Sequence, residues 1–237
     1  MKLGVIAALR QELAPTFGSI PTTPRLVDGL RFHEAPSLVF VASGVGARLA
    51  AAAALLTADT FRPDALLSVG FCGALTDELE TADLVLGGTP SHPAEPGLLA
   101  RARSAARQPR LGTVLTVPQV VVLAARKTEL AARTGALVID MEADAVALAA
   151  KARGLGFLAV KVVIDTPAAP LASTYSGCWT VAKDLLRGSL VGMIHDSRRV
   201  KLAAERLKDF FVALSGSLGA AGGTTTAGPS AGPTSAS

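Results

Sequence analysis

The stretch that decides the fold is Phe157-Leu158-Ala159-Val160-Lys161-Val162-Val163-Ile164, and Asp165 follows it directly. All of its residues except Lys161 are apolar, and several are β-branched. An uninterrupted apolar run of this kind is typical of a strand that is buried on both faces, as in parallel sheets covered by helices. The run therefore predicts an interior strand whose carboxyl end presents an acid.

Shorter apolar runs recur before this strand, and alanine-rich segments with helical character lie between several of them. The predicted strands are residues 3–7, 38–42, 65–69, 84–86 and 114–122. The predicted helices are residues 48–57, 142–152 and 181–186. This alternation predicts an α/β fold, namely a single-domain three-layer α/β/α sandwich with a mixed, largely parallel central sheet. Ligands bind such folds at the carboxyl ends of the strands.

The length and composition predict one folded domain with a tail. A chain of 237 residues, half of them apolar, can bury one large core, and we expect this domain to span residues 1–214. From residue 215 to 237 the composition falls to Gly, Ala, Thr, Ser and Pro with a single Leu218. Such a segment buries too little apolar surface to order itself, so residues 215–237 are predicted to be a disordered tail.

The composition also argues against several classes of protein. The net charge is +4, but the basic residues are spread along the chain without interleaved aromatic residues, so we expect no nucleic-acid partner. The longest apolar run, residues 49–56, is too short to span a bilayer, and the mean hydropathy of +0.44 is attributed to a buried sheet. The two cysteines and the absence of a signal-like start favour a reducing cytoplasm.

The dispersed His33, His92 and His195 have no metal-ligand spacing, so we expect no metal, and we expect no cofactor. Near the end of the predicted domain, residues 198–211 alternate basic and apolar side chains in an amphipathic helical pattern. Such a helix usually covers a core. The alternative is a peripheral contact with an anionic or lipid surface.

Two glycine-rich turns follow predicted strands. Residues 44–49, Gly-Val-Gly-Ala-Arg-Leu, begin like a dinucleotide-binding fingerprint, but Leu49 stands where the third glycine belongs. A nicotinamide dehydrogenase is therefore not favoured, and a tight structural turn explains the glycines equally well. In residues 69–75, glycines flank Phe71 and Cys72, where the backbone can approach a ligand closely, although packing alone is the alternative. No histidine lies nearby in the sequence to activate Cys72.

Acids stand at the ends of two further strands. Asp140 precedes a predicted helix and fits the role of its N-cap. Capping explains Glu142 less completely, because its carboxylate can also point into a crevice and accept hydrogen bonds from sugar hydroxyls. Asp165 follows the strand predicted at residues 157–164, and a role in a turn or helix cap is the structural alternative to a role in chemistry.

Together these segments resemble the nucleoside phosphorylase and nucleosidase superfamily, most closely the methylthioadenosine and adenosylhomocysteine nucleosidase group. Residues 1–12 look like that group's first strand and catalytic glutamate, and the turns at 43–46 and 70–75 look like its substrate loops. Asp140-Met141-Glu142-Ala143 matches its ribose-binding motif, and residues 161–165 match the strand that ends in its purine-binding aspartate. Each motif is weak alone, but all of them occur in register over residues 1–167.

The resemblance implies a site that cleaves an N-glycosidic bond. Asp165 would donate a proton or hydrogen bond to N7 of the purine, and Glu12 would take a proton from the attacking water. For Asp165 to act as an acid near neutral pH, its pKa would have to be raised by burial. Glu142 would bind the 2′-hydroxyl, with Met141 along the sugar. The implied substrate-binding residues are Ala8, Val45, Phe71, Cys72, Gly73, Val120, Val121, Met141, Glu142 and Lys161.

The chain also departs from the family's pattern. Ile164 replaces a usual serine, Lys161 a usual arginine, and Val120 stands where a phenylalanine stacks on adenine. These changes leave the cleavage residues in place but argue against methylthioadenosine itself as the substrate. The region after Leu75 is also shorter than in the relatives, which would open the site towards a bulky or apolar 5′ substituent. A second, less specific resemblance, at residues 195–199 and the amphipathic helix, is to members associated with hopanoid synthesis, which remove adenine from adenosylhopane. Relatives of the group also imply a homo-oligomer.

Other functions stay open at this point. A phosphate-dependent purine nucleoside phosphorylase would need cations around phosphate. The chain lacks a Gly-Asp-Pro-x-Arg type of loop near the first strand, although Arg10, Arg48 and Lys161 could gather an anion. A nucleoside-binding module without turnover is the non-enzymatic alternative. The joint presence of Glu12, Glu142 and Asp165 argues against it, because a binding site needs no acid to activate water.

Overall fold

The structure is a computed structural model that describes residues 1–168 and 198–220. Its strands are β1 Leu3–Ala7, β2 Thr23–Val27, β3 Leu30–Glu34, β4 Leu38–Ala42, β5 Ala65–Ala74, β6 Leu84–Gly87, β7 Arg110–Leu111, β8 Val114–Thr116, β9 Val138–Asp140 and β10 Gly156–Asp165. Its helices are α1 Arg10–Phe17, α2 Ala47–Phe61, α3 Pro96–Ala105, α4 Ala124–Thr134, α5 Ala143–Ala152 and α8 Arg198–Ala220. The predicted helix at residues 181–186 lies outside the described residues.

The strands form one mixed sheet in the order β2-β3-β4-β1-β5-β10-β6-β7, with β9 beside the far end of β5 and β8 beside β9. Strands β4, β1, β5 and β10 run parallel to one another at its centre. Strand β3 is antiparallel to both β2 and β4, and β6 is antiparallel to β10. The described part of the sheet is therefore mixed with a parallel centre, as the sequence predicts.

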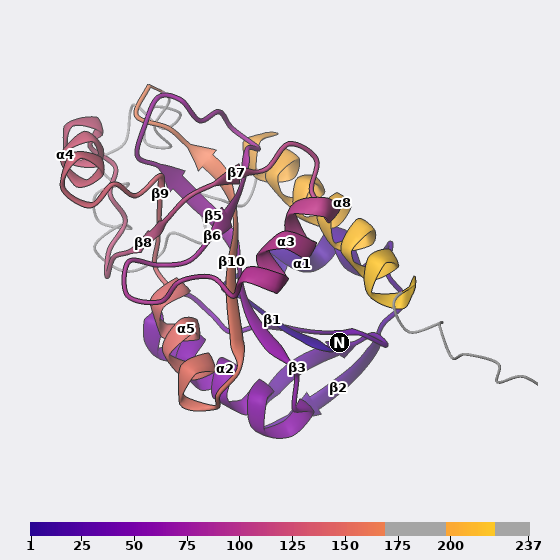
Figure 1. The fold of residues 1–237 in the computed structure, drawn as a ribbon. Helices are drawn as coiled ribbons and strands as arrows, with labels where there is room; N and C mark the ends of the chain where they lie inside the picture. The colour runs from indigo at the N-terminus through magenta and orange to yellow at the C-terminus, as the bar shows by residue number, and fades with distance from the viewer. Residues whose placement is uncertain (169–197, 221–237) are drawn as a thin grey trace, which may run out of the picture.

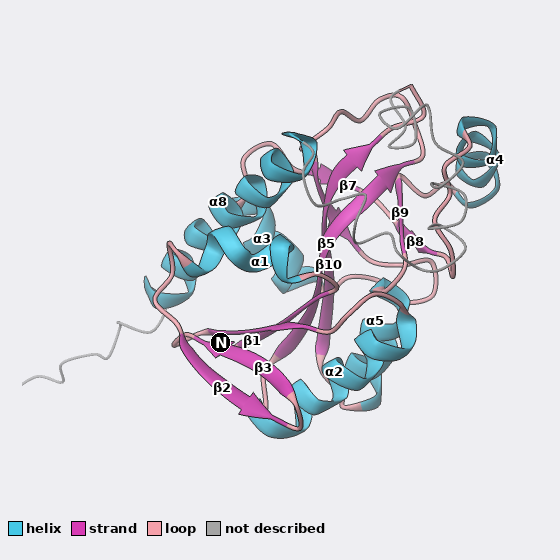
Figure 2. Cartoon of the chain, turned by 180° about the vertical axis from the view of Figure 1, so that it is seen from behind, coloured by secondary structure: helices cyan, strands magenta, loops and turns pink. Residues whose placement is uncertain are grey.

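Helices cover both faces of this sheet (Figures 1 and 2). Helices α2 and α5 pack together on one face, over a cluster of buried residues that includes Phe32 and Phe157. Helices α1, α3 and α8 cover the other face, over a cluster that includes Phe40 and Phe211. Both clusters are mainly aliphatic, and the three-layer sandwich is confirmed. Helix α4 lies apart, at the end of the molecule that carries β8 and β9 (Figure 1).

Local chemistry explains where several helices begin and end. Helix α2 is rich in alanine, the best helix former, and ends where Arg62 adopts a left-handed conformation before Pro63. Helix α3 begins with Pro96, and the Glu95 side chain accepts hydrogen bonds from the amides of Gly97 and Leu98. Helix α5 begins at Ala143, one residue later than predicted.

The predicted strands are confirmed with changed lengths in several cases. Strands β1 and β4 have the predicted bounds, while β5 and β10 extend further at their carboxyl ends. The prediction of a strand over 114–122 is wrong beyond Thr116, where Pro118 cannot donate a ladder hydrogen bond. The β2–β3 hairpin was not predicted because β2 is almost wholly exposed and carries no apolar run.

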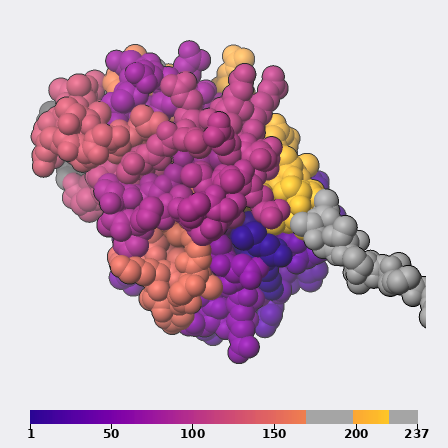
Figure 3. Space-filling view, viewed as in Figure 1, coloured from indigo at the N-terminus to yellow at the C-terminus, as the bar shows by residue number. Residues whose placement is uncertain are grey.

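The prediction that disorder begins at residue 215 is wrong for residues 215–220, which continue helix α8. Leu218 is 5% exposed and packs in the same cluster as Phe211, so this end of the helix does bury apolar surface. In the space-filling view α8 lies directly against the body of the protein (Figure 3). Residues 221–237 lie outside the described residues. None of the helices within 1–168 and 198–220 is long and apolar enough to cross a bilayer.

We predict that Phe211→Ala lowers the free energy of unfolding by about 3 to 5 kcal/mol, because it opens a cavity under α8. Phe211 is fully buried, with its ring 5.2 Å from the ring of Phe40. The matched control is Val212→Ala on the next residue, whose side chain is exposed, and it should change stability little. Urea unfolding of the three proteins measures the difference. Equal midpoints for both variants would mean that α8 does not cover the core.

Candidate active site

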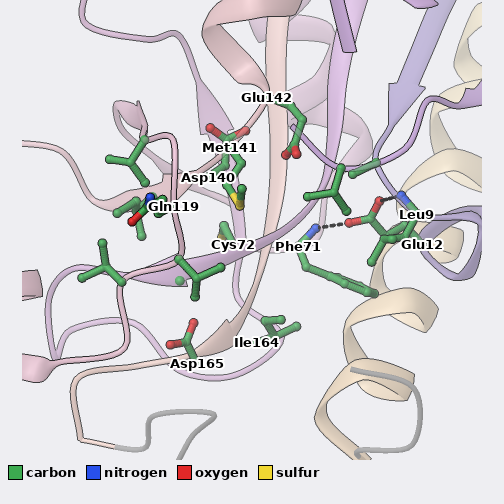
Figure 4. Close-up of a pocket in the computed structure, with 17 residues that line it drawn as sticks. Leu9, Glu12, Phe71, Cys72, Gln119, Asp140, Met141, Glu142, Ile164 and Asp165 are labelled. Atoms are coloured by element: carbon green, nitrogen blue, oxygen red, sulfur yellow. Dashed lines mark hydrogen bonds between the residues drawn. The ribbon is translucent and has the colours of Figure 1, made fainter. Parts of the chain in front are cut away.

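One cavity opens at the carboxyl ends of the central strands (Figure 4). Four parts of the chain far apart in sequence form about half of its wall. The segments after β1 and β4 contribute Ala8, Leu9, Glu12 and Val45. The end of β5 contributes Phe71, Cys72 and Gly73, and the end of β10 contributes Ile164 and Asp165.

The rest of the described wall comes from the chain around β8 and β9. The segment between β8 and α4 contributes Val117, Gln119, Val120 and Val121. The end of β9 and the residues before α5 contribute Ile139, Asp140, Met141 and Glu142. Every site residue predicted from the sequence therefore lines this cavity, with the exception of Lys161.

Glu12 is held in place by two backbone amides. Its Oε2 accepts a hydrogen bond of 2.7 Å from Leu9 N, and its Oε1 accepts one of 2.7 Å from Phe71 N. The side chain is buried, and burial raises the pKa of Glu12 to about 7, although both hydrogen bonds and the charge of Lys161 act in the opposite direction. A carboxyl with this pKa exchanges protons readily near neutral pH.

The residue at position 70 must be glycine for Glu12 to lie where it does. Gly70 has a φ of 143°, which favours glycine, and a Cβ atom there would lie 2.4 Å from Oε1 of Glu12. The Gly-Phe-Cys-Gly segment was predicted to be a turn but forms the end of strand β5, and its first glycine allows close approach of a side chain of the protein itself.

Glu142 reaches the cavity from the residue just before helix α5. Its Oε1 accepts a hydrogen bond of 2.7 Å from the amide of Gly46, in the first glycine-rich turn. Burial raises the pKa of Glu142, opposed by the charge of Lys161 and by this hydrogen bond. The helix is capped instead by Asp140, whose Oδ2 accepts a bond of 2.9 Å from Ala143 N. Capping therefore leaves Glu142 free to face the cavity, as the sequence suggested.

Asp165 lies at the last residue of β10, where a bulge between Val163 and Asp165 changes the strand register. The bulge sets Asp165 opposite Gly73 of β5. Its carboxylate forms an ion pair with Lys127 of α4. Burial nevertheless raises the pKa of Asp165, with the Lys127 charge opposing the rise. This direction agrees with the sequence-based expectation for an acid.

Lys161 does not line the cavity, in contrast to the expectation that it contacts substrate. It lies beneath the wall, 1% exposed, with its Nζ 2.7 Å from Asp140 Oδ2 and 2.9 Å from Ser68 Oγ. Burial lowers the pKa of Lys161, but the charges of Asp140, Glu142 and Glu12 outweigh this effect and raise it. Strand β10 is buried on both faces, so packed residues enclose the side chain of Lys161. Its positive charge stabilises the carboxylates of the neighbouring acids Asp140, Glu142 and Glu12.

Sequence reasoning missed several residues. Leu9, Val117, Gln119 and Ile139 line the cavity, but they carry no motif that would single them out. Lys127 was also missed, because the charged residues next to it in the sequence are typical of a solvent-exposed helix. Its complete burial beside Asp165 depends on the position of α4 in the tertiary structure.

Cys72 lines the cavity, and burial raises its pKa well above the usual range, so the side chain is a neutral thiol. His33 and His92 lie elsewhere, and His195 falls outside the described residues. Within residues 1–168 and 198–220, no three His, Cys, Asp or Glu side chains are grouped to hold a metal ion.

A family model described as the phosphorylase superfamily matches residues 2–183. The chain belongs to the phosphorylase superfamily. The match covers the motifs within residues 2–167 and confirms the superfamily resemblance that they indicated.

Among curated proteins, the chain is similar to several 5′-methylthioadenosine/S-adenosylhomocysteine nucleosidases. The one from Listeria monocytogenes serotype 4a (strain HCC23) is 28% identical over 91 residues, which are 36% of this chain and 39% of the relative. The one from Aeromonas salmonicida (strain A449) is 30% identical over 92 residues, 36% of this chain and 40% of the relative. The match thus spans about two fifths of the length of these relatives.

Several solved structures share the fold over about nine tenths of the chain. The 5′-methylthioadenosine/S-adenosylhomocysteine nucleosidase from Neisseria meningitidis in complex with methylthio-immucillin-A has a TM-score of 0.72 and 18% identity, covering 91% of this chain and 99% of its own. The futalosine hydrolase of Helicobacter pylori strain 26695 has a TM-score of 0.69 and 17% identity, covering 89% and 97%. At these identities the likeness establishes the fold.

We predict that Lys161→Met lowers the free energy of unfolding by about 3 to 5 kcal/mol, because it leaves the buried Asp140 without its cation. The control is Lys151→Met, at an exposed position of α5. Denaturant unfolding at neutral pH measures both variants. If the two variants are equally stable, the ion pair beneath the cavity does not support the site.

Proposed function

We propose that this protein is a purine nucleosidase, which hydrolyses the N-glycosidic bond of an adenosine-type nucleoside. The observation that carries the proposal is that Glu12, Glu142 and Asp165 line one cavity, each with a pKa raised by burial. They come from three distant parts of the sequence. A structural role alone gives no reason for three acids to meet in one partly apolar cavity, where burial disfavours their charged forms.

The chemistry of the bond assigns a role to each acid. When the C1′–N9 bond breaks, its electron pair goes to the purine and the sugar becomes electron-deficient. Asp165 donates a proton to N7 of the leaving purine. Glu142 accepts a hydrogen bond from the 2′-hydroxyl and stabilises the positive charge on the sugar. Glu12 accepts the proton of the water that attacks C1′.

The remaining wall residues are assigned to binding. In this arrangement the purine is surrounded by Val120, Val121, Cys72 and Gly73, and Phe71 faces the 5′ side of the substrate. Met141, Ala8 and Val45 lie along the sugar. The relatives named as methylthioadenosine/adenosylhomocysteine nucleosidases and as a futalosine hydrolase support a nucleoside as the substrate class.

Water is favoured over phosphate as the nucleophile. The described wall of the cavity contains no arginine, lysine or histidine, and phosphate needs such donors or exposed amides. Arg10 instead lines a separate pocket with Arg31 and His33, and Lys161 lies beneath the wall. A phosphorylase would need cations around its phosphate, and the described wall of the cavity offers none. The role of Glu12 as the acceptor of a proton from water likewise favours an enzyme over a non-catalytic binding module.

We further propose that the 5′ group of the substrate is bulky or apolar, as in adenosylhopane of hopanoid biosynthesis, with methylthioadenosine or adenosylhomocysteine as the smaller alternatives. Figure 4 places the apolar side chains of Phe71 and Ile164 between Asp165 and Glu12. Helix α8 presents exposed Leu202 beside its basic residues, which suits peripheral contact of a cytoplasmic enzyme with a membrane surface. We also propose that the protein forms a homo-oligomer.

The direct test is release of adenine from purified protein in phosphate-free buffer. The nucleosides to compare are adenosine, methylthioadenosine, adenosylhomocysteine, inosine and a lipid-linked adenosine. We predict adenine release without phosphate, with the highest kcat/KM for an apolar 5′ group. Asp165→Asn should lower kcat by about 10² to 10⁴, because the amide cannot give up a proton. Binding without release would favour the sensing module, and strict dependence on phosphate would favour the phosphorylase.

We predict that kcat/KM falls as the pH drops below about 7, by about tenfold per pH unit, because Glu12 must be ionised to accept a proton. This fall is the acidic limb of the pH profile, and the raised pKa of Glu12 places it well above the pKa of an ordinary glutamate. Glu12→Gln should be much slower and should lack the limb. The control is Glu129→Gln on the exposed face of α4, which should keep the wild-type profile. A wild-type limb near pH 4.5 would contradict the assignment of Glu12 as the base.

A further inference from the structure

The buried ion pair between Lys127 and Asp165 is not explained by the roles assigned so far. Lys127 lies in the first turns of α4 and is 0% exposed, which is rare for a lysine. Its ammonium contacts Oδ2 of Asp165. Burying a lysine is unfavourable unless a partner compensates the charge, so the structure maintains this contact against a large desolvation penalty.

The pair is arranged with the acid in front and the lysine behind. Asp165 lines the cavity and its side chain is 10% exposed, whereas Lys127 does not line the cavity. A purine in the cavity would therefore meet Asp165 and not the ammonium. Lys127 can influence the reaction only through the carboxyl group.

Gly73 makes room for this arrangement. A Cβ atom at position 73 would lie 2.7 Å from Oδ1 of Asp165 and 3.4 Å from Nζ of Lys127. The backbone of β5 thus passes closely beside both members of the pair. The same glycine belongs to the glycine-rich segment that the sequence singled out, now the end of β5, and its lack of a side chain leaves space for the ion pair.

Other charged or titratable groups near Asp165 are few in the described part of the chain. Arg199, in the first turn of α8, exerts a coulombic effect on Asp165 that is smaller than that of Lys127. Cys72 of β5 lies close enough for both Asp165 and Lys127 to affect its thiol, which is neutral. Lys127 is therefore the main described countercharge of Asp165.

We propose that Lys127 is a positioning residue that stabilises the Asp165 carboxylate formed during the reaction, an inference that rests on the proposed function. The proton of Asp165 moves to N7 while the C1′–N9 bond breaks and its electron pair enters the purine. Asp165 becomes a carboxylate, and the adjacent ammonium of Lys127 compensates the new charge and keeps its own protons. In the absence of this cation, the carboxylate would form unpaired in a buried site.

The test compares wild type with Lys127→Met on two kinds of nucleoside. An ordinary purine nucleoside needs a proton on its leaving group, whereas an N7-methylated purine nucleoside already carries the positive charge. We expect Lys127→Met to lower kcat roughly 10²-fold on the ordinary substrate and far less on the methylated one. General damage to the site would lower both rates equally, and that result would overturn the inference.

The pH profile gives an independent readout. Asp165 must be protonated to act, so activity falls as the pH rises through its pKa. Loss of the cation lets that pKa rise further, so the basic limb of Lys127→Met should move to higher pH by about 1 to 3 pH units. An unmoved basic limb would overturn the inference. Arg126→Met, which removes an exposed cation from the preceding position of α4, is the control and should leave both readouts unchanged.

Lys127→Gln covers the case in which the methionine variant does not fold, because its amide can still donate a hydrogen bond to Asp165. The same two outcomes decide the inference for that variant. If wild type releases adenine and the lysine variants match it, the inference fails while the proposed function stands. If wild type cleaves no purine nucleoside at all, the proposed function fails and takes the inference with it.

Discussion

The burial of carboxyl groups at the carboxyl edge of the sheet is the constraint on which the rest of this structure depends. Glu12, Asp140 and Asp165 are all buried there, and Glu142 is partly buried beside them. Removing a carboxylate from water is strongly unfavourable, so each group must be neutralised, hydrogen-bonded or paired with a cation. The structure uses all three solutions, and the choice differs from one acid to the next.

The cations are placed so that the acids have different properties. Asp140 is paired at 2.7 Å with the buried Lys161 and also accepts a bond of 2.8 Å from Thr116 Oγ1, so it is a structural carboxylate. Glu12 has backbone donors and forms no ion pair with a residue in 1–168 or 198–220, and burial dominates its pKa. Asp165 lies between these cases, with a countercharge behind it and the cavity in front. Titratable groups whose surroundings differ in this way can serve as acid and base in one reaction.

Glycines determine where these acids can lie. Gly46 donates its amide to Glu142, Gly70 leaves space for Glu12, and Gly73 leaves space for Asp165 and its lysine. These glycines thus serve the protein's own carboxyl groups, whereas phosphate-binding turns use exposed amides for the ligand. Gly70 and Gly73 lie at the end of β5 and Gly46 lies between β4 and α2, so a rigid parallel sheet fixes the relative positions of groups that are distant in sequence.

The sequence by itself determined the α/β class, the central strands and the acids that end or follow them, because apolar runs and the residues after them are local features. It also indicated that Asp140 caps a helix and leaves Glu142 for another role. Only the tertiary structure decided that Lys161 lies beneath the cavity, that Lys127 is buried against Asp165, and that residues 215–220 extend a helix over the core. The physical reason is that the environment of a charged side chain depends on which distant elements pack around it. Local sequence records the charge of a lysine, but burial and partners are set by the assembled sheet and its helices.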